Sequence, residues 1–402
     1  MRYAVANTSY VYFQKSNRIP ISFVMKYFYR LLICLSGCLI FLLVHSGLGL
    51  LPSLAAEKVT VRYGLFEQSI PVADIRNYSE TQKVSSDLKS FLDYLSVKEK
   101  QKFQEALQVK MSLDIVALDK LVNTGMGKQI LSFASGAIAR RDQASIQALR
   151  SALIVGAKSP EGLGITSFLE AYPSDQLVID ASKIKKLVGM ANSSASSADA
   201  PPKDDVSSSP LGKVALQYQT LAAQDKQFSG CLFGDSISAG LGNTLGSGTF
   251  NFGLNGLSTI SLLEQLKSLI PTKVKCEKAI IAIGGNDALY KISDELFSKN
   301  LQEAIALLRT MATKEIFLIP AFYSTVAASS DPKVAAPNSR VEQINLLINQ
   351  VAETEKLPVA AAGLAPLYEN NVLKENLTSD GDHLNTEGLK IYRQALLQIL
   401  GK

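Results

Sequence analysis

The sequence predicts an α/β protein. Residues 227–402 are expected to form a three-layer sandwich on a parallel sheet of about five strands, and residues 57–191 a small, mostly α-helical domain. Two observations predict this. In the C-terminal half, short apolar runs alternate with longer amphipathic segments, which is the pattern of parallel strands with helices on both faces. The N-terminal half shows almost only helical spacing of its apolar residues. A chain of 402 residues is long enough for two such domains.

Composition excludes one class of function. The net charge of +5 is spread along the chain, with no block of Lys and Arg dense enough to follow a phosphate backbone. Charged residues make up only 19% of the chain, and the mean hydropathy is +0.13. We therefore expect a targeted globular protein that does not bind nucleic acid.

The excess of apolar residues lies near the N-terminus. Residues 31–51 carry no formal charge and have the length that a helix needs to cross a bilayer core. Lys26 and Arg30 precede this stretch, and the small residues of 53–55 follow it, as in a secretory signal. We expect residues 1–56 to act as a cleaved signal peptide. The alternative is an uncleaved anchor that associates with the membrane through residues 31–51.

Both possibilities export the rest of the chain, because the positive flank stays in the cytoplasm. The protein is then expected to be periplasmic or secreted, or anchored at the membrane. Met25 directly precedes the apolar block, so translation could start there. Residues 35–38 resemble a bacterial lipobox, but the long apolar run after Cys38 argues against lipidation.

The N-terminal domain opens with alternating residues at 58–62, which predict a strand, and 68–72 could be its hairpin partner. A capping box at 96–99 starts a helix. Further helices are expected at 113–122, 129–138 and 184–190, and after an N-cap at Asp142. The domain holds no histidine and no clustered carboxylates, so its apolar stripes are interpreted as core.

Three motifs of this region also carry a resemblance. They are VTVRYG at 59–64, PEGL at 160–163 and LVID at 177–180. Residues 56–191 resemble a domain found at the N-terminus of cyanobacterial proteins, usually ahead of an α/β-hydrolase domain. The function of that family is unknown, so the resemblance assigns no site.

Residues 192–226 are predicted to be a disordered linker. The stretch from 192 to 210 is rich in Ser, Ala, Pro and Asp and cannot bury enough apolar surface to order itself.

Two of the four cysteines lie in the apolar leader, which leaves Cys231 and Cys276 in the exported part. Neither has a neighbouring cysteine or the spacing of a metal site. They could pair in an oxidising compartment. Because both are expected at or beside buried strands, we predict two free thiols instead.

In the C-terminal half, the apolar run that reaches Gly234 is the first expected strand, and 249–252, 279–283, 315–319 and 358–362 are the others. Helices are expected at 258–268, 294–311, 339–355 and 386–400. In such sheets the chemistry gathers at the C-terminal ends of the strands. Ser236 follows the first strand, Gly256 the second, and a Gly-Gly-Asn-Asp segment at 284–287 the third.

The histidine count identifies a partner for Ser236. The chain has two histidines, and His45 lies in the leader, so a serine-histidine pair must use His383. Asp380 lies three residues upstream, from where its carboxylate can hold the imidazole Nδ1–H and stabilise the imidazolium.

Four ordered blocks resemble those of the SGNH, or GDSL, hydrolase family. The blocks are GDS at 234–236, NFGLNG at 251–256, GGND at 284–287 and DGDH at 380–383. The resemblance covers the whole C-terminal domain, and it implies a flavodoxin-like arrangement of the sheet.

The same resemblance implies a catalytic site. Ser236 would be the nucleophile, His383 the general base and Asp380 the residue that orients it. The oxyanion hole would consist of the backbone N–H of Ser236, the backbone N–H of Gly256 and the side-chain amide of Asn286.

The family has a glycine that is followed by a Ser/Thr-rich stretch in the second block. The resemblance therefore implies that Gly256, which such a stretch follows, supplies the oxyanion N–H rather than Gly253. Asp235 and Asp287 are expected to support their turns, and Asp382 is either a neighbour of the catalytic site or a solvated turn residue. No metal and no cofactor are expected.

The resemblance thus implies an exported serine esterase that cleaves acyl esters or thioesters through an acyl-enzyme. Its substrate could be a small molecule, a lipid or an acylated glycan, and the loops at 289–296 and 323–338 would select it. Two alternatives stay open. The same site could act as an acyltransferase, or the protein could be an envelope binding or scaffolding module whose helical domain does the work.

Overall fold

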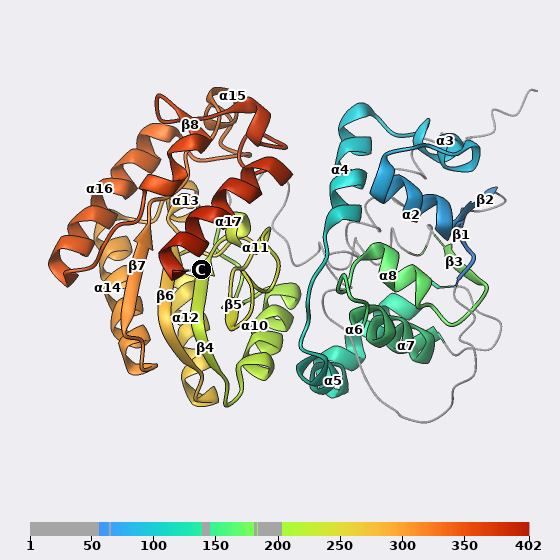
Figure 1. Cartoon of the computed structure of the whole chain (residues 1–402), viewed down its shortest axis with the longest axis horizontal. Coiled ribbons are helices and arrows are strands. Elements are labelled where there is room, and N and C mark those ends of the chain that lie inside the picture. The colour runs from blue at the N-terminus through green and yellow to red at the C-terminus, as the bar shows by residue number, and fades with distance from the viewer. Residues whose placement is uncertain (1–55, 64–65, 139–144, 181–182, 184–202, 402) are drawn as a thin grey trace, which may run out of the picture.

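The computed structural model describes residues 56–63, 66–138, 145–180, 183 and 203–401 (Figure 1). Residues 1–55 of the predicted leader, the predicted N-cap Asp142 and the predicted helix at 184–190 lie outside the described residues. Among the helices of the described ranges, none is both long enough and apolar enough to cross a membrane.

The N-terminal region is built around a small sheet of order β2-β1-β3. β1 (Lys58–Tyr63) and β2 (Phe66–Pro71) form the predicted hairpin, and β3 (Gln176–Asp180) runs parallel to β1 on its other side. This pairing closes the region by joining its first and last elements. The remaining elements are the helices α2 (Val72–Thr81), α3 (Ser86–Leu92), α4 (Val97–Gln108), α5 (Ile115–Asn123), α6 (Gly125–Ser135), α7 (Ser145–Ala157) and α8 (Ile165–Glu170).

The predicted capping box is present at the start of α4. The side chain of Ser96 accepts from the backbone N–H of Glu99 at 3.3 Å, and the Glu99 carboxylate accepts from the backbone N–H of Ser96 at 2.9 Å. The helices bury most of their apolar residues, as α4 does with Phe103 and Leu107 at 1% and 0% exposure, although Ile146 at the start of α7 is exposed. The interpretation of these stripes as core is confirmed.

The predicted disordered linker is wrong over a large part of its length, because α10 (Pro210–Ala223) occupies it. Ser209 caps the helix by accepting from the backbone N–H of Gly212 at 3.1 Å, and Pro210 stands where a helix tolerates proline. The helix buries Val214 and Tyr218 and packs against both α5 and α12 (Thr259–Leu269), between the two regions of the chain (Figure 1). Burial of this apolar stripe, rather than composition, determines the order of the segment.

The C-terminal region is built on four parallel strands in the order β5-β4-β6-β7. These are β4 (Gln227–Gly234), β5 (Thr249–Asn251), β6 (Lys275–Ala282) and β7 (Glu315–Ile319). Successive side chains of β4 pack into two different cores, one on each face of the sheet. Cys231 and Phe233 belong to a core shared with α12, α14 (Asp294–Thr310) and α16 (Asn338–Glu355), whereas Leu232 packs in a second core with α17 (Thr386–Leu400). The predicted three-layer arrangement is confirmed.

The α-helices of this region are α11 (Ser236–Ala239), α12 (Thr259–Leu269), α13 (Gly285–Leu289), α14 (Asp294–Thr310), α15 (Val326–Ser329), α16 (Asn338–Glu355) and α17 (Thr386–Leu400). Three short 3-10 turns, η1 (Ile270–Thr272), η2 (Ala362–Leu367) and η3 (Glu375–Leu377), and a small hairpin of β8 (Tyr368–Glu369) and β9 (Val372–Leu373), complete the described elements.

The strand predicted at 358–362 is reduced to a single bridge between Val359 and Leu318 of β7. Leu318 donates its N–H to the carbonyl of Pro358 at 3.0 Å, and Ala360 donates back to Leu318 at 2.8 Å. The pairing ends there because the backbone turns to helical angles at Ala361 and enters η2. The sheet therefore has four strands where about five were predicted.

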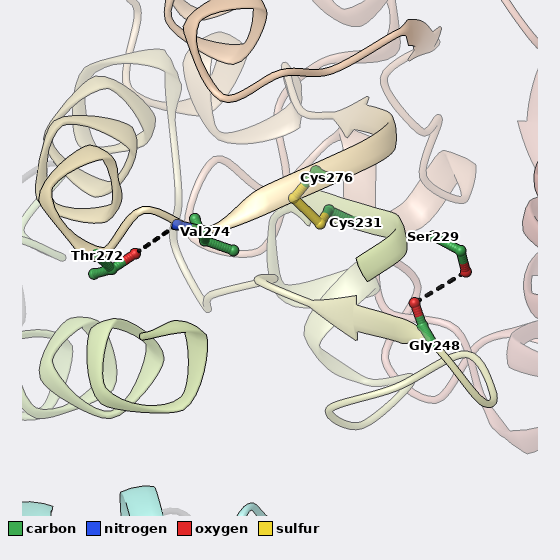
Figure 2. The surroundings of a disulfide bond; sticks show 6 residues. All are labelled: Ser229, Cys231, Gly248, Thr272, Val274 and Cys276. Carbon is green, nitrogen blue, oxygen red and sulfur yellow. Dashed lines mark hydrogen bonds between the residues drawn. A yellow bond between two sulfur atoms is a disulfide. The ribbon is translucent and has the colours of Figure 1, made fainter. Parts of the chain in front are cut away.

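The prediction of two free thiols is also wrong. Cys231 and Cys276 form a disulfide that joins β4 to β6 (Figure 2). The two strands are neighbours in the sheet, and the Cα atoms of the cysteines lie 5.8 Å apart, within bridging range. The two cysteines lie 45 residues apart in sequence, and only the pairing of the strands brings their sulfur atoms together.

Candidate active site

The nucleophile candidate lies at the C-terminal edge of the sheet, as predicted. β4 ends at Gly234, and Ser236 is the first residue of the short helix α11. Asp235 caps this helix, since its carboxylate accepts from the backbone N–H of Ile237 at 3.0 Å. The cap fixes the turn that carries the Ser236 hydroxyl.

A second turn, 147 residues further along the chain, carries the base candidate. Ser236 Oγ lies 2.9 Å from His383 Nε2, and His383 Nδ1 lies 3.0 Å from Asp380 Oδ2. The other carboxylate oxygen of Asp380 accepts from the backbone N–H groups of Asp382 and His383, at 3.1 and 2.8 Å. The three predicted catalytic side chains are therefore joined in series by hydrogen bonds.

The electrostatics of the pair follow from this geometry. The hydrogen bond to Asp380 raises the pKa of His383 to about 9, because it outweighs the cost of burying an imidazolium, and the charges of Asp382 and Asp235 add to it. Burial alone would raise the pKa of Asp380. The hydrogen bonds that it accepts and the nearby imidazole hold that pKa well below its usual range. Asp380 is therefore an anion at any ordinary pH.

Asp382 lies beside the imidazole, with its Oδ2 4.0 Å from His383 Nδ1. Burial raises the pKa of its carboxyl. The backbone N–H of Asp382 donates to the carboxylate of Asp380, so Asp382 also helps to hold Asp380 in place.

The candidate oxyanion residues come from three segments. Gly256 has φ of +77°, a conformation that favours glycine. Its carbonyl accepts from Tyr290 Oη at 3.1 Å, and the next carbonyl, that of Leu257, accepts from Asn286 Nδ2 at 3.2 Å. Within the described residues, the backbone N–H groups of Ser236 and Gly256 have no acceptor. Both N–H groups are therefore available to donate a hydrogen bond to another oxygen.

Gly253, the other glycine of this block, is used differently. Its backbone N–H already donates to Asn251 Oδ1 at 2.9 Å. A side chain there would also meet the backbone nitrogen of Ala239 at 2.7 Å. Close packing, rather than substrate contact, accounts for this glycine.

Asp287 was expected to support its own turn, but its carboxylate binds Thr259 at the start of α12. It is fully buried, and its carboxylate accepts from the N–H and the hydroxyl of Thr259, at 3.0 and 2.5 Å. Burial raises the pKa of Asp287 to about 6 and that of Asp235 to about 7.

Gly284, which begins the GGND segment, has φ of +126°. A Cβ at this position would lie 2.8 Å from the side chain of Ile344, so only glycine fits.

A hollow opens beside the nucleophile. The predicted loops 289–296 and 323–338 contribute part of its wall. Its lining comprises Asp235, Ser236, Ile237, Gly285, Asn286, Leu289, Phe322, Ser324, Ala335, Ala336, Val341 and Asp382.

Two residues of the site were missed by the sequence reasoning. Tyr290 holds the carbonyl of Gly256, and Asp204 accepts hydrogen bonds from the start of α12. Tyr290 follows the GGND block closely, and this proximity could have drawn attention to it. Asp204 carries no such signal, because it lies within the polar stretch interpreted as a linker.

A hydroxyl, an imidazole and a carboxylate in series at the edge of a parallel sheet are the features of the serine hydrolases. Residues 232–391 match the family described as GDSL-like lipase/acylhydrolase. The C-terminal domain is thus a GDSL-like lipase/acylhydrolase domain, and the protein is an ester-hydrolysing enzyme. Residues 55–180 match a family described as alpha/beta hydrolase of unknown function.

Several solved structures are similar to part of this chain. A GDSL-like lipase from Bacteroides thetaiotaomicron has 18% identity and a TM-score of 0.37, over 44% of this chain and 88% of that one. An acetylxylan esterase from Geobacillus stearothermophilus has 18% identity and a TM-score of 0.35, over 45% and 96%. A lipase/acylhydrolase from Enterococcus faecalis has 22% identity and a TM-score of 0.35, over 44% and 96%. No curated protein matches the chain.

Proposed function

We propose that this protein is an exported serine esterase that cleaves acyl esters through an acyl-enzyme on Ser236. The observation that carries the proposal is the series of hydrogen bonds from Ser236 Oγ to His383 Nε2 and from His383 Nδ1 to Asp380. The reaction needs both contacts. The hydroxyl is a weak nucleophile until a base takes its proton, and the carboxylate keeps that base in the correct orientation.

In the first half of the reaction, Ser236 Oγ attacks the ester carbonyl while His383 Nε2 takes the hydroxyl proton. The imidazolium so formed is stabilised by Asp380, which stays ionised. The tetrahedral intermediate collapses with cleavage of the bond to the alcohol. His383 returns its proton to the departing oxygen, which leaves an ester on Ser236.

In the second half, water attacks this ester and His383 takes a proton from the water. Collapse of the second tetrahedral intermediate releases the carboxylic acid and restores the Ser236 hydroxyl. In both halves negative charge develops on the former carbonyl oxygen. The N–H groups of Ser236 and Gly256 and the amide of Asn286 are assigned to that oxygen; Asn286 carries a second amide hydrogen besides the one donated to Leu257.

The hollow next to Ser236 supports an acyl ester as substrate. Leu289, Phe322 and Val341 give it apolar walls suited to an acyl group, and the alanines at 335 and 336 leave room between them. We assign the alcohol part to a small molecule, a lipid or a glycan.

Export is supported by the disulfide between Cys231 and Cys276, because such bonds persist in oxidising compartments. The uncharged stretch at 31–51, with positive residues before it, is consistent with this location. In the proposal, the chain works outside the cytoplasm.

The test of the chemistry is hydrolysis of short and medium p-nitrophenyl esters by the purified full chain, together with labelling by a fluorophosphonate probe. Ser236→Ala is expected to abolish both, with a loss of turnover on the order of 10⁶. Ser90→Ala is the matched control, since Ser90 is an exposed serine of α3. A folded Ser236→Ala variant that labels and turns over like wild type would refute the proposal.

The test of export is separate. The chain expressed in its own host is fractionated, and the thiols of the isolated protein are alkylated and mapped by mass spectrometry. The proposal expects the chain outside the cytoplasm with Cys231 and Cys276 protected from alkylation. Recovery in the cytoplasm with both thiols alkylated would overturn the location and leave the esterase chemistry untouched.

A further inference from the structure

The segment 203–209 leads from the N-terminal region into α10 and lies outside the matched hydrolase domain, which spans 232–391. It nevertheless packs on that domain. Val206 is 4% exposed, and its methyl group would lie 3.6 Å from a Cβ placed on Gly256. Residues from outside the hydrolase domain therefore contact the loop of the proposed oxyanion glycine.

Asp204 makes the strongest contacts of this segment. Its carboxylate accepts from the hydroxyls of Ser258 and Ser261 and, at 3.1 Å, from the backbone N–H of Ser261. It also accepts from the backbone N–H of Val206 at 3.2 Å. The two serines are buried, with 0% and 1% exposure. A half-buried carboxylate with four donors is held firmly, and it holds its donors equally firmly.

The donors of Ser258 and Ser261 lie at the N-cap and in the first turn of α12, where a negative charge is favourable. Ser258 is the N-cap of that helix, and it follows Gly256 by two residues. Gly256 is also held through its own carbonyl, which accepts from the hydroxyl of Tyr290. The left-handed backbone of Gly256 is thus held by Tyr290 at its carbonyl and by Asp204 through Ser258, two residues further along the chain.

We propose that Asp204 is a positioning residue for ester hydrolysis, which orients the backbone N–H of Gly256 toward the developing oxyanion by anchoring Ser258 and Ser261. This inference rests on the proposed function, because it needs Gly256 in the oxyanion hole. It means that the segment ahead of the hydrolase domain completes the catalytic site.

The fold of α12 does not depend on Asp204 alone. Thr259 is bound by the buried Asp287, and Leu262, Leu266 and Leu269 are fully buried in the core. Loss of Asp204 is therefore expected to loosen the loop without unfolding the domain. An oxyanion donor that is lost altogether costs on the order of 10² to 10³ in turnover. A donor that is only misplaced should cost about 10-fold to 100-fold.

The first experiment compares Asp204→Ala with Asp205→Ala in the full chain, with p-nitrophenyl acetate as substrate. Asp205 is an exposed neighbour of equal charge, so its variant controls for the loss of an anion. We expect Asp204→Ala to lower kcat at least 10-fold, with KM and the melting temperature little changed, and Asp205→Ala to match wild type. Equal kcat for Asp204→Ala and Asp205→Ala would overturn the proposal.

The second experiment separates positioning from general support by combining Asp204→Ala with Asn286→Ala. If both act on the same oxyanion, the double variant loses much less than the product of the single losses. Multiplying losses would overturn the proposal. If Asp204→Ala does not fold, Ser261→Ala replaces it, because it removes one donor to the same carboxylate and keeps the charge.

The two proposals fail in different ways. If wild type neither hydrolyses the ester nor reacts with the fluorophosphonate, the proposed function fails, and the role of Asp204 fails with it. If Ser236→Ala abolishes activity while Asp204→Ala retains it, the esterase stands and only the inference about Asp204 is wrong.

Discussion

A cluster of carboxylates in the N-terminal region and the two buried carboxylates beside Ser236 have different partners. In the N-terminal region, Glu161 and Glu170 pair with Arg76, and Glu161 also pairs with Lys110, at partly exposed positions that tie α2 to the end of α8 and to the loops after α4 and α7. The hydrogen bond from Arg76, followed in strength by that from Lys110, lowers the pKa of Glu161 to about 2 despite partial burial.

In the C-terminal region, the described contacts of Asp235 and Asp287 are to neutral backbone and hydroxyl donors, at buried positions, and burial raises the pKa of both. Such arrangements cost stability and gather where chemistry needs fixed geometry. The comparison teaches that changes to the Glu161 cluster should alter stability, and changes to the carboxylates around Ser236 should alter turnover.

Asp380→Asn should give the largest effect on turnover among the changes that spare the nucleophile, with a loss of about 10⁴ in kcat, because His383 loses the anion that orients it. The measurement is ester hydrolysis, with Asp331→Asn, at an exposed aspartate of the same domain, as control. Turnover within 10-fold of wild type would show that another group orients the imidazole.

Asn286→Ala should lower kcat by about 10² to 10³ while the protein stays folded, since one oxyanion donor is removed. Asn349→Ala, at an exposed amide on α16, is the matched control and should leave kcat unchanged. Steady-state kinetics and thermal unfolding check both variants. A folded Asn286→Ala variant with near-wild-type kcat would remove the residue from the oxyanion hole.

The disulfide is a feature of the C-terminal region that should affect stability rather than turnover. Cys231→Ala combined with Cys276→Ala should lower the free energy of unfolding by roughly 2 to 4 kcal/mol, because the bridge restricts the unfolded chain. Denaturant unfolding with and without reductant measures this loss. Reductant should destabilise wild type and leave the double variant unchanged; an equal response of the two proteins would contradict the bridge.

The pH profile should follow His383. Its imidazole must be neutral to accept the serine proton, and its pKa is raised from 6.5 to about 9. kcat/KM should therefore rise about 50-fold between about pH 7 and pH 9. The raised pKa contributes stability that is present below 6.5 and lost as pH rises through about 9. Initial rates on a substrate with a pH-insensitive readout check this, and a plateau reached near pH 6.5 would be inconsistent with it.

Glu161→Gln should give the smallest effect, a loss of about 1 kcal/mol in stability with unchanged kcat, because the ion pairs lie near the surface. The lowered pKa of Glu161 contributes stability that is present above its ordinary value of 4.5 and lost as pH falls toward about 2. Thermal unfolding across this range tests it. A change in kcat would break the division between the two groups of carboxylates.

Much of the site could be predicted from local sequence. β7 occupies 315–319 as expected, α17 occupies 386–400, and Ser236, Asp380 and His383 meet as their order along the chain suggested. Apolar periodicity and turn residues act over a few neighbours, so they fix strands, helices and the edge at which the strands end.

The remaining features depended on contacts between distant residues. The bridge between Cys231 and Cys276 needs the pairing of β4 with β6, and the short contact at Val359 needs the turn into η2. α10 orders because it packs between α5 and α12.

The sequence by itself determined that a hydroxyl, an imidazole and a carboxylate meet at the edge of a parallel sheet. Only the tertiary structure decided the hydrogen bonding of the two glycines: the N–H of Gly253 donates to Asn251, whereas the N–H of Gly256 has no acceptor among the described residues. It also placed Asp204 against Ser258 and Ser261. Hydrogen-bond partners far apart in sequence leave no periodic pattern, because their proximity arises when separately formed elements pack together.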